Sequence, residues 1–455
     1  MNLAMSLLAA CERHPDAEAF PRLTYGELLP RIRRLAGGLG LGPGERLAIV
    51  GDNRLETALL YWAAQWAGVV AVPLSWRLSE AELDYCIGDC GAVHVIRDGD
   101  VLPNGPEHPG ALDRAETETS LILYTSGTTG RSKGVPRSHA ADRAGGWSQA
   151  LQHGYLPGDR TLGVMPLYHT MGIHSLVAMH LVGGCYVPQA RWDAGEALQL
   201  IARERITSLY LAPTLFHDLT THPELGATDT SSVRALGYAG AAMTSALVRR
   251  CADAFSPEVF VNHYGSTEIY TFSIGRDQLG KPGCAGRAAI NTRLRLSENG
   301  EILVHLSSDE AFSGYWNRPD ADAKALADGW YHTGDTGHLD ADGDLWIDGR
   351  LDDMIISGGE NIHPLEVEEI LAAHPGVAEA AVVGEPDDRL GHRVVAYLVA
   401  TASAEELDAH CLASPLARFK RPRAYHHVEA LPRSASGKIL RRMLREAESD
   451  QMTSS

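Results

Sequence analysis

Strand-like runs alternate with helical stretches along most of this chain, and this alternation is the feature that most constrains its fold. The runs are Arg46 to Val50, Val69 to Val72, Val93 to Ile96, Leu121 to Tyr124, Ser208 to Ala212, Ala235 to Tyr238 and Val259 to Asn262. Short apolar runs of this kind are typical of strands that helices cover on both faces. The pattern therefore predicts an α/β fold class, with a large N-terminal multi-sheet α/β domain.

The pattern changes after about residue 350 of the 455 residues. A helix is expected to start at Pro364, since proline is favoured in the first turn. Two strand-like runs follow, Ala380 to Val383 and Val394 to Val399, and then a basic tail. We predict a small α+β domain of typical domain size here, which divides the chain into residues 1–351 and 352–455.

Composition excludes several classes of protein. Hydrophobic residues make up 44% and charged residues 22%, as in ordinary globular chains. The net charge of −18 disfavours nucleic acid and anionic membrane as partners. An anionic ligand therefore needs a local basic cluster. The segment from Ser414 to Arg445 has nine basic residues and one acidic residue, Glu429. A solvated tail is the alternative interpretation of that segment.

Cysteine usage and hydropathy favour the cytoplasm. The seven cysteines contain no CxxC pair and no zinc-like spacing, which favours a reducing compartment. Two uncharged stretches, Ala58 to Leu74 and Met171 to Ala190, are interrupted by glycine or histidine, so we expect no membrane span. Leu8 to Cys11 resembles a lipoprotein cleavage box, but no Lys or Arg precedes it, so we expect an amphipathic helix there.

A glycine-rich loop follows one of the strongest predicted strands. The strand ends at Thr125, and the loop runs from Ser126 to Gly134 with Lys133 near its end. Backbone N–H groups of such a loop can close around phosphate, and the hydroxyls and the lysine add donors and charge. A flexible Ser/Gly linker is the alternative. The spacing is not that of a Walker A motif, which disfavours P-loop ATP chemistry.

At this point the chain resembles the adenylate-forming superfamily of acyl-CoA synthetases, luciferases and peptide-synthetase adenylation domains. Five segments carry the resemblance in order: Thr125 to Gly134, Tyr264 to Glu268, Trp330 to Asp335, Gly349 to Asp352, and Pro432 to Lys438. The chain is most similar to aryl-CoA ligases of the 4-chlorobenzoate:CoA ligase type. That similarity lies in Met165 to His169, Asp353 to Pro364 and Phe419 to Pro422.

The resemblance implies a two-step activation of an aromatic or cyclic carboxylic acid by ATP, Mg²⁺ and coenzyme A. It implies catalytic roles for four residues: Lys438 would orient carboxylate and phosphate, Glu268 would ligate Mg²⁺, Thr267 would bind the α-phosphate, and His169 would gate the acyl pocket. The implied nucleotide-binding residues are Thr125, Ser126, Gly127, Thr128, Thr129, Gly130, Lys133, Tyr264, Gly265, Ser266, Asp335 and Arg350.

The resemblance also implies a coenzyme A site and a hinge. Asp352 would be the hinge about which a mobile small domain rotates between the two half-reactions. The coenzyme A site would include Arg77, Ser357, Gly358, Gly359, Phe419 and Arg421. Leu390 stands where the related ligases have a tryptophan against coenzyme A, and Ser132 stands where the phosphate loop usually has proline.

The acyl pocket implied by the resemblance contains His169 and seven further residues: Gly146, Trp147, Thr170, Met171, Ala239, Gly240 and His263. Tyr168 to Met171 contains no aspartate to hold a substrate amine, which disfavours amino acids as substrates. His263 replaces an aliphatic residue and Gly146 replaces a bulky aromatic one. We therefore expect a roomier and more polar pocket than in the related ligases.

Two alternatives remain open at this point. The acyl-adenylate could be transferred to a carrier-protein thiol in place of coenzyme A. The chain could also be a non-catalytic nucleotide-binding homologue, although the retained Lys133, Glu268, Asp335, Arg350 and Lys438 argue against it. The sequence does not decide between a monomer and a homodimer.

Overall fold

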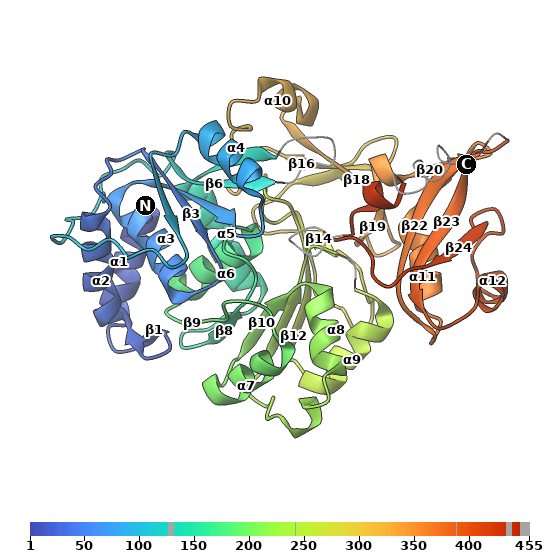
Figure 1. The fold of residues 1–455 in the computed structure, drawn as a ribbon, viewed down its shortest axis with the longest axis horizontal. Helices are drawn as coiled ribbons and strands as arrows, with labels where there is room; N and C mark the ends of the chain where they lie inside the picture. The colour runs from blue at the N-terminus through green and yellow to red at the C-terminus, as the bar shows by residue number, and fades with distance from the viewer. Residues whose placement is uncertain (126–131, 242, 388, 434–438, 446–455) are drawn as a thin grey trace. The chain divides into compact units, whose positions relative to one another are not determined.

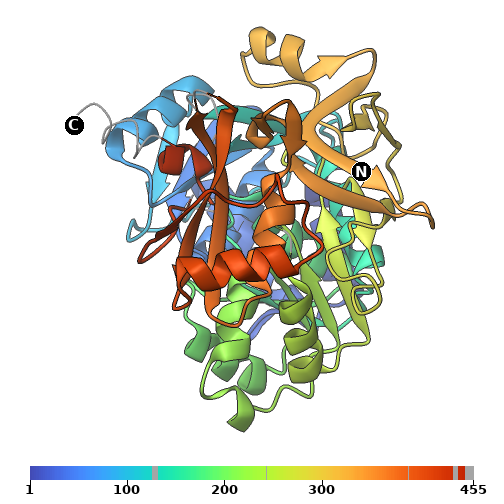
Figure 2. The ribbon, with the colours of Figure 1, turned by 90° about the vertical axis from the view of Figure 1, so that its right-hand side faces the viewer.

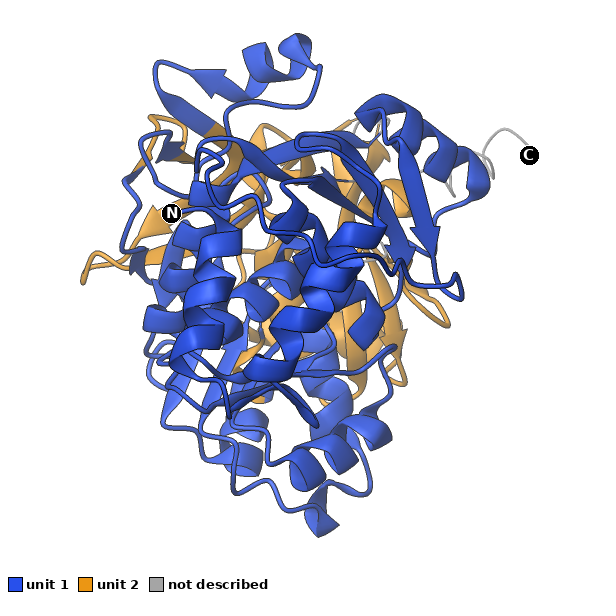
Figure 3. Cartoon of the chain, turned by 90° about the vertical axis from the view of Figure 1, so that its left-hand side faces the viewer, with its two compact units in different colours: residues 1–243, 247–294, 304–331 blue, residues 244–246, 295–303, 332–455 orange. Residues whose placement is uncertain are grey.

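The structure is a computed structural model, which describes residues 1–125, 132–241, 243–387, 389–433 and 439–445. The chain divides into two compact units, shown in different colours in Figure 3. The first comprises residues 1–243, 247–294 and 304–331, and the second comprises residues 244–246, 295–303 and 332–455. Compactness does not locate a hinge, so the boundary at Asp352 stays a prediction.

A five-stranded sheet in the first unit has the order β5-β3-β4-β6-β7 (Figure 1). Its strands are β3 (Arg46–Gly51), β4 (Val70–Ser75), β5 (His94–Arg97), β6 (Thr119–Thr125) and β7 (Lys133–Ser138). The first four strands are parallel, and β7 is antiparallel to β6. The four strands predicted in this region are confirmed. The glycine-rich segment therefore connects two paired strands, with Thr125 opposite Lys133.

Helices α1 (Leu3–Arg13), α2 (Tyr25–Gly38), α3 (Leu55–Ala67), α5 (His139–Gln152) and α6 (Thr170–Leu181) lie around this sheet, and α4 (Glu80–Cys90) leads into β5. One apolar core joins Leu7, Leu28, Trp62, Trp66 and Ile173 from four of these helices. The expected first helix is present, and the Asn2 side chain caps it by accepting from Met5 N.

A seven-stranded sheet in the same unit has the order β14-β13-β12-β11-β10-β8-β9. Its strands are β8 (Arg160–Gly163), β9 (Cys185–Pro188), β10 (Ser208–Leu211), β11 (Ala235–Tyr238), β12 (Val259–Tyr264), β13 (Ser273–Gly275) and β14 (Arg287–Ala288). Helices α7 (Ala194–Glu204), α8 (Pro213–Thr221) and α9 (Ser245–Phe255) lie beside it in green in Figure 1. The three strands predicted here are confirmed, and β8 to β12 are parallel.

Ten further elements lie before residue 354 in the described part of the chain. They are β1 (Glu18–Phe20), β2 (Leu23–Thr24), a 3₁₀ turn (Leu225–Ala227), β15 (Leu294–Leu296), β16 (Glu301–His305), α10 (Pro319–Ala325), β17 (Leu326–Ala327), β18 (Trp330–Leu339), β19 (Leu345–Arg350) and a second 3₁₀ turn (Leu351–Asp353). Strands β18 and β19 are antiparallel, with Asp335 opposite Arg350.

The second unit contains the predicted α+β arrangement (Figure 2). Its elements are β20 (Ile355–Ser357), β21 (Glu360–Ile362), α11 (Pro364–Ala372), β22 (Val377–Asp387), β23 (Gly391–Ala400), α12 (Ala404–Ala413) and β24 (Ala424–His427). Alternation along β22 produces two cores: Val382 packs with Val367 and Leu407 of the helices, whereas Val383 packs with Leu431 and Leu444. The helix predicted from Pro364 and both predicted strands are confirmed.

All seven cysteines are buried and carry free thiols. In the described part of the chain, no helix combines the length and the apolar character that crossing a bilayer requires. The two uncharged stretches instead contribute the helix–strand pair α3–β4 and the helix–strand pair α6–β9.

Gly68 allows a stability prediction for the first unit. It ends α3 with a φ of 71°, and a Cβ atom there would lie 2.8 Å from the Cβ of Ala111. Gly68→Ala should therefore lower the free energy of unfolding by about 1–2 kcal/mol, from left-handed strain and crowding together. A lower midpoint of urea unfolding should show this loss of stability. Gly226→Ala serves as the control, because no other atom lies within 4 Å of the position of a Cβ on Gly226. Equal midpoints for the two variants would contradict the prediction.

Candidate active site

The loop that leaves β12 has a backbone that is too tightly closed for any residue but glycine at its first turn. A Cβ atom on Gly265 would lie 1.8 Å from the carbonyl oxygen of Tyr270. Ser266 N donates to Ile269 O at 3.0 Å, and Ser266 Oγ accepts from Glu268 N at 3.2 Å. These contacts curl residues 264–270 back on themselves. The turn places Thr267 and Glu268 at its tip.

Glu268 is buried within the first unit and is held by one hydroxyl group. Tyr315 Oη donates to Glu268 Oε1 at 2.8 Å, and Phe312 N donates to Glu268 O at 2.8 Å. Burial, and then the Glu268 carboxylate, raise the pKa of Tyr315, so its hydroxyl stays protonated and can donate. Lys133 Nζ lies 4.2 Å from the centroid of the Tyr315 ring. Tyr315 therefore connects two residues that the sequence analysis had named separately.

Thr267 contacts the start of α6. Thr170 Oγ1 donates to Thr267 Oγ1 at 3.0 Å, and Arg137 Nη1 donates to Thr267 O at 2.9 Å. His169 is the N-cap of α6, where its Nδ1 accepts from Met171 N at 3.3 Å. The structure thus brings together Thr170 and Thr267, which lie almost a hundred positions apart.

An aromatic and sulfur-containing cluster lies beside this junction. It consists of Met165, Met171, Tyr210, Ala212, Ala239 and Tyr270, with Leu215 packed against it. Met171 and Ala239 were expected in an acyl pocket, and the structure places them in one cluster. Gly240, which follows Ala239, is exposed with a φ of 88°. Tyr210 and Tyr270 were missed, because only the fold shows that they face Met171 and Ala239.

His263 does not make this region polar in the way we had expected. It is 2% exposed, and its Nε2 lies 3.2 Å from Tyr270 O while its Nδ1 lies 3.1 Å from His153 Nε2. A carbonyl only accepts, so Nε2 carries the proton and Nδ1 accepts from His153. Burial lowers the pKa of His263 to about 4, which keeps the ring neutral. Both ring nitrogens are used by the protein, so they offer nothing to a substrate.

Gly146 does not make the region roomier. A Cβ atom there would lie 2.8 Å from Val177 Cγ1 and 2.9 Å from Leu181 Cδ1, so the missing side chain lets α5 approach α6. The next residue, Trp147, is 37% exposed on α5. At the neighbouring Gly145, a Cβ atom would meet His174 at 2.7 Å. The expectation of extra space was wrong because helix packing fills it.

The nucleotide residues predicted in the second unit form a pair across β18 and β19. Arg350 Nη1 donates to Asp335 Oδ1 at 2.8 Å and to Thr333 O at 3.0 Å, and Thr333 Oγ1 accepts from Asp335 N at 3.0 Å. The Asp335 side chain is 16% exposed and that of Arg350 is 41% exposed. Asp352 lies in the 3₁₀ turn directly after β19. A carboxylate fixed in this way can accept from two neighbouring hydroxyl groups.

The two glycines predicted for the coenzyme A site form the turn between β20 and β21. Gly358 and Gly359 have φ values of 60° and 89°, which glycine adopts without strain. Ser357 ends β20, and Gly358 N donates to Leu390 O at 2.8 Å. Leu390 Cδ2 lies 3.4 Å from the position of a Cβ on Gly358. The residue that replaces the expected tryptophan therefore lies against this turn.

The basic segment of the second unit is largely paired with carboxylates. Lys420 Nζ lies 2.6 Å from Glu366 Oε2, and Arg421 pairs with Asp408. Phe419 is 41% exposed. In the first unit, the Arg77 guanidinium carbon lies 5.1 Å from the centroid of the Trp76 ring. The predicted coenzyme A residues thus occupy three separate local settings, and their role stays a prediction.

Six predicted residues lie outside the described part of the chain, namely Ser126, Gly127, Thr128, Thr129, Gly130 and Lys438. Their described neighbours are Thr125, whose Oγ1 donates to Lys133 O at 3.4 Å, and Ile439, which pairs with Arg433. Glu268 offers carboxylate oxygen, the ligand type that Mg²⁺ prefers. The carboxylate of Glu268 therefore fits the metal of a magnesium nucleotide.

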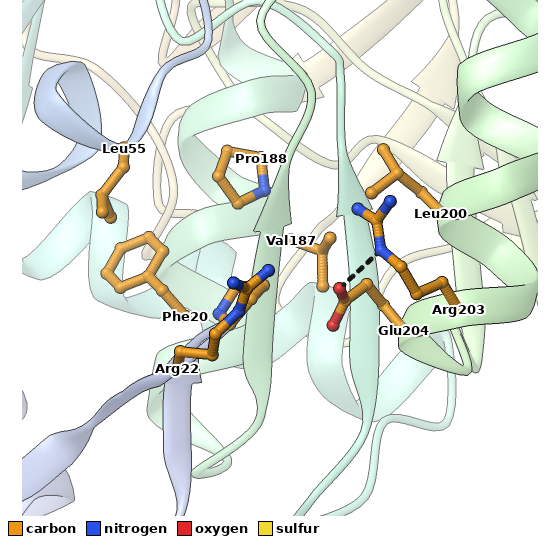
Figure 4. Close-up of a pocket in the computed structure, with 9 residues that line it drawn as sticks. Phe20, Arg22, Leu55, Val187, Pro188, Leu200, Arg203 and Glu204 are labelled. Atoms are coloured by element: carbon orange, nitrogen blue, oxygen red, sulfur yellow. Dashed lines mark hydrogen bonds and ion pairs between the residues drawn. The ribbon is translucent and has the colours of Figure 1, made fainter.

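Two surface hollows lie apart from these motif residues. The hollow in Figure 4 has a volume of about 180 Å³, and Figure 4 shows Arg203 paired with Glu204 near Val187, with Phe20 and Arg22 on the opposite side of the lining. The other has a volume of about 240 Å³ and is lined by residues including Ile49, Thr57 and Asp98. Neither lining contains a residue predicted for ATP, acid or coenzyme A, so we assign neither to the reaction.

Comparisons with known proteins identify the class that this fold and these motifs define. A family model described as AMP-binding enzyme matches residues 7–316, and one described as AMP-binding enzyme C-terminal domain matches residues 366–438. The chain therefore belongs to the adenylate-forming superfamily that includes the AMP-forming acyl-CoA ligases. This finding confirms the family and the fold class expected from the motifs.

Its relatives include enzymes named for aromatic acids. The chain is 35% identical to a feruloyl-CoA synthase of an Amycolatopsis species, over 92% of each chain. It is 34% identical to a 4-chlorobenzoate–CoA ligase of an Arthrobacter species, over 98% of this chain and 95% of the other. Among solved structures, ATP-bound MatB from Rhodopseudomonas palustris matches with a TM-score of 0.89 at 27% identity, over 99% of each chain.

The Tyr315 hydroxyl generates a prediction about magnesium. Tyr315→Phe removes the donor that orients the Glu268 carboxylate, and a hydrogen bond to a charged group contributes about 1.5–3 kcal/mol. We expect the Mg²⁺ concentration that gives half-maximal ATP–pyrophosphate exchange to rise roughly 10-fold to 100-fold, in line with that energy. Tyr186→Phe is the control, because the Tyr186 hydroxyl has no hydrogen-bond partner among the described residues. Unchanged magnesium dependence in Tyr315→Phe would refute this role.

Proposed function

We propose that this protein is an AMP-forming acid:CoA ligase that activates an aromatic or cyclic carboxylic acid. One observation carries the proposal: the Thr170–Thr267 hydrogen bond of 3.0 Å joins the nucleotide motif to the start of α6. The next residue, Met171, belongs to the cluster that contains Tyr210 and Tyr270. A carboxylic acid whose apolar end lies in that cluster would present its carboxylate near Thr267, the residue that would bind the α-phosphate.

The apolar character of the cluster supports an aromatic or alicyclic acid. Aromatic and thioether side chains favour flat rings through stacking and sulfur contacts. The neutral, fully bonded His263 offers no positive charge to an additional acidic group. The names of several relatives include a ring acid, among them 2-succinylbenzoate–CoA ligase of Bacillus cereus at 32% identity, although the acid in that name carries a second carboxylate. An anthranilate CoA ligase in complex with anthranoyl-AMP also matches, with a TM-score of 0.90 at 25% identity.

In the first half-reaction, a carboxylate oxygen of the acid attacks the α-phosphorus of ATP. A phosphorus–oxygen bond forms, the bond to pyrophosphate breaks, and the acyl-adenylate remains. Thr267 would donate to the α-phosphate, Lys133 would place positive charge near the phosphates, and Asp335 would accept from the ribose hydroxyls. Bound Mg²⁺ would neutralise charge on the phosphates, with the Glu268 carboxylate as its ligand.

In the second half-reaction, the thiol sulfur of coenzyme A attacks the acyl carbon. The carbon–sulfur bond forms, the bond to AMP breaks, and the thiol proton is released. We propose that rotation about Asp352 exchanges Lys438 for the turn at Gly358 and Gly359 between the two steps. Phe419, Arg421 and Arg77 would then contact the nucleotide of coenzyme A.

A panel of acids tests the substrate class. Benzoates, hydroxybenzoates, cyclohexane acids and medium-chain fatty acids would be compared by kcat/KM in ATP–pyrophosphate exchange. We expect kcat/KM for the best ring acid to be roughly 10-fold or more above that for the best fatty acid, since shape and one or two apolar contacts change kcat/KM by that factor. A preference for fatty acids would refute the aromatic assignment, and no exchange with any acid would favour a non-catalytic homologue.

Lys438→Ala tests the division between the half-reactions. Removing one positive charge from the transition state of adenylation should lower pyrophosphate exchange by roughly 100-fold or more. The attack of coenzyme A on supplied acyl-adenylate should change little. Equal loss of both half-reactions would contradict the role of Lys438. If only a phosphopantetheinyl protein discharges the wild-type adenylate, the carrier-protein alternative would replace coenzyme A.

A further inference from the structure

A fully buried ion pair lies directly behind the Thr267 loop. Arg137 on β7 and Asp142 on α5 both have side chains that are 0% exposed, and Arg137 Nε lies 2.6 Å from Asp142 Oδ1. Ser120 Oγ donates to the other carboxylate oxygen, Asp142 Oδ2, at 2.9 Å. Two hydrogen bonds therefore fix the Asp142 carboxylate, which in turn fixes the plane of the guanidinium.

Stability does not explain why the chain keeps this pair. Taking two charges out of water costs several kcal/mol for each ion in effective terms, and apolar residues of similar volume are often equally stable. The burial cost is visible in Asp142, whose pKa is raised by desolvation although Arg137 lowers it. A buried pair with so little net benefit for stability can instead have the task of holding a neighbouring group in one position.

The geometry identifies that task. While Arg137 Nε is held by Asp142, Arg137 Nη1 donates to the carbonyl oxygen of Thr267 at 2.9 Å. Thr267 lies 130 positions later in the chain, at the tip of the loop that carries Glu268. The guanidinium is planar and its donors are fixed relative to one another, so holding one edge directs the other.

Other bonds hold the rest of this loop, and among the described residues Arg137 is the donor to that carbonyl. Phe312 N donates to Glu268 O at 2.8 Å, and Thr271 N donates to a buried Glu310 carboxylate oxygen at 2.8 Å. The Thr170 hydroxyl contacts the Thr267 hydroxyl, which is the group that would bind phosphate. The N–H of the same peptide, that of Glu268, donates to Ser266 Oγ at 3.2 Å, so loss of the Arg137 contact would leave this peptide plane held on one side only.

We propose that Arg137, held by Asp142, is a positioning residue for Thr267 and Glu268 in the adenylation step. The inference rests on the proposed function, since it assigns Thr267 and Glu268 to the phosphates and the metal. Neither Arg137 nor Asp142 needs to touch a substrate. Catalytic groups have to be placed closely, and a misplacement of about 1 Å can cost roughly 100-fold in rate.

The test uses a variant in which the ion pair is replaced as a unit. Arg137→Met/Asp142→Leu removes both charges and preserves apolar volume, so the melting temperature should stay close to that of the wild type. We expect kcat of ATP–pyrophosphate exchange to fall roughly 10-fold to 100-fold, with KM for the acid little changed. Attack of coenzyme A on supplied acyl-adenylate should fall by much less. A wild-type kcat in the folded double variant would overturn the proposal.

A matched control addresses general effects of removing charge. Arg160 lies 2.9 Å from Glu204 and 2.7 Å from Glu18, a partly exposed cluster that contacts the Thr267 loop in no described side-chain interaction, and Glu18 can turn to solvent when Arg160 is removed. Arg160→Met/Glu204→Leu should leave kcat unchanged. Arg137→Lys provides a further comparison, because one ammonium group lacks the fork that reaches Asp142 and Thr267 in a fixed geometry. Full activity of Arg137→Lys would also count against the proposal, and this variant serves if the double variant does not fold.

Hydrogen exchange separates this inference from the proposed function. In the wild type, amides of residues 264–271 should be protected, and in Arg137→Met/Asp142→Leu they should exchange at least several-fold faster, while the control double variant matches the wild type. This readout does not require catalysis. If the wild type activated no acid, the proposed function would fail while the exchange data would still decide whether Arg137 holds the loop. Unchanged protection in the Arg137 variant would refute the positioning role.

Discussion

The closed turn at Gly265 is the constraint on which the rest of the site depends. The Tyr270 carbonyl oxygen occupies the position that a side chain on residue 265 would need, at 1.8 Å from its Cβ. The chain therefore reverses within a few residues after β12, and Thr267 and Glu268 project from the reversal. The hydrogen bonds from Tyr315 to Glu268 and from Thr170 to Thr267 therefore form on a loop whose base is already closed. The end of β12 determines where Thr267 and Glu268 lie, and the closed turn determines the direction in which they project.

The interior next to this turn is polar, and the histidine rings in it are neutral. Tyr270 Oη donates to Gln149 Oε1 at 2.6 Å, and His174 stacks on the Tyr270 ring at a centroid distance of 3.7 Å. Desolvation lowers the pKa of His174, so that ring stays neutral like His263. Buried polar groups that bond to one another rigidify a wall and offer no charge to a ligand. If the proposed acid lies against this wall, shape and apolar contact would select it.

The sequence allowed the elements to be predicted better than the contacts between them. Each predicted strand was confirmed because a continuous apolar run between turn residues has few other uses in an α/β chain. Asp335 and Arg350 were each expected to contact the nucleotide, and the register of β18 and β19 places them opposite each other. Tyr315 and Arg137 were missed because nothing local distinguishes a tyrosine or an arginine that acts on a residue far along the chain.

The two errors at the acyl pocket have the same physical origin. Reading Gly146 as empty space and His263 as an available polar group treats each position by itself. In the structure, a helix approaches the glycine and two protein groups occupy the histidine nitrogens. Packing at native density removes space that a single substitution seems to create. Substitutions therefore predict pocket properties only when the residues that face them are known.

The paired charges of the second unit can be ranked by how readily a polyanion could use them. Arg441 Nη2 contacts both Glu368 oxygens at 2.7 Å, and the two side chains are 19% and 10% exposed. Breaking such a buried pair costs about 3–5 kcal/mol, so Arg441 serves the fold. Arg421 is exposed to nearly the same degree as Arg441, at 22%, but its partner Asp408 is the more exposed carboxylate, at 32%, and also accepts from Tyr425 Oη at 3.2 Å. The proposed contact of Arg421 with coenzyme A would require a phosphate to displace this more exposed carboxylate, whereas Arg441 would stay bound to Glu368.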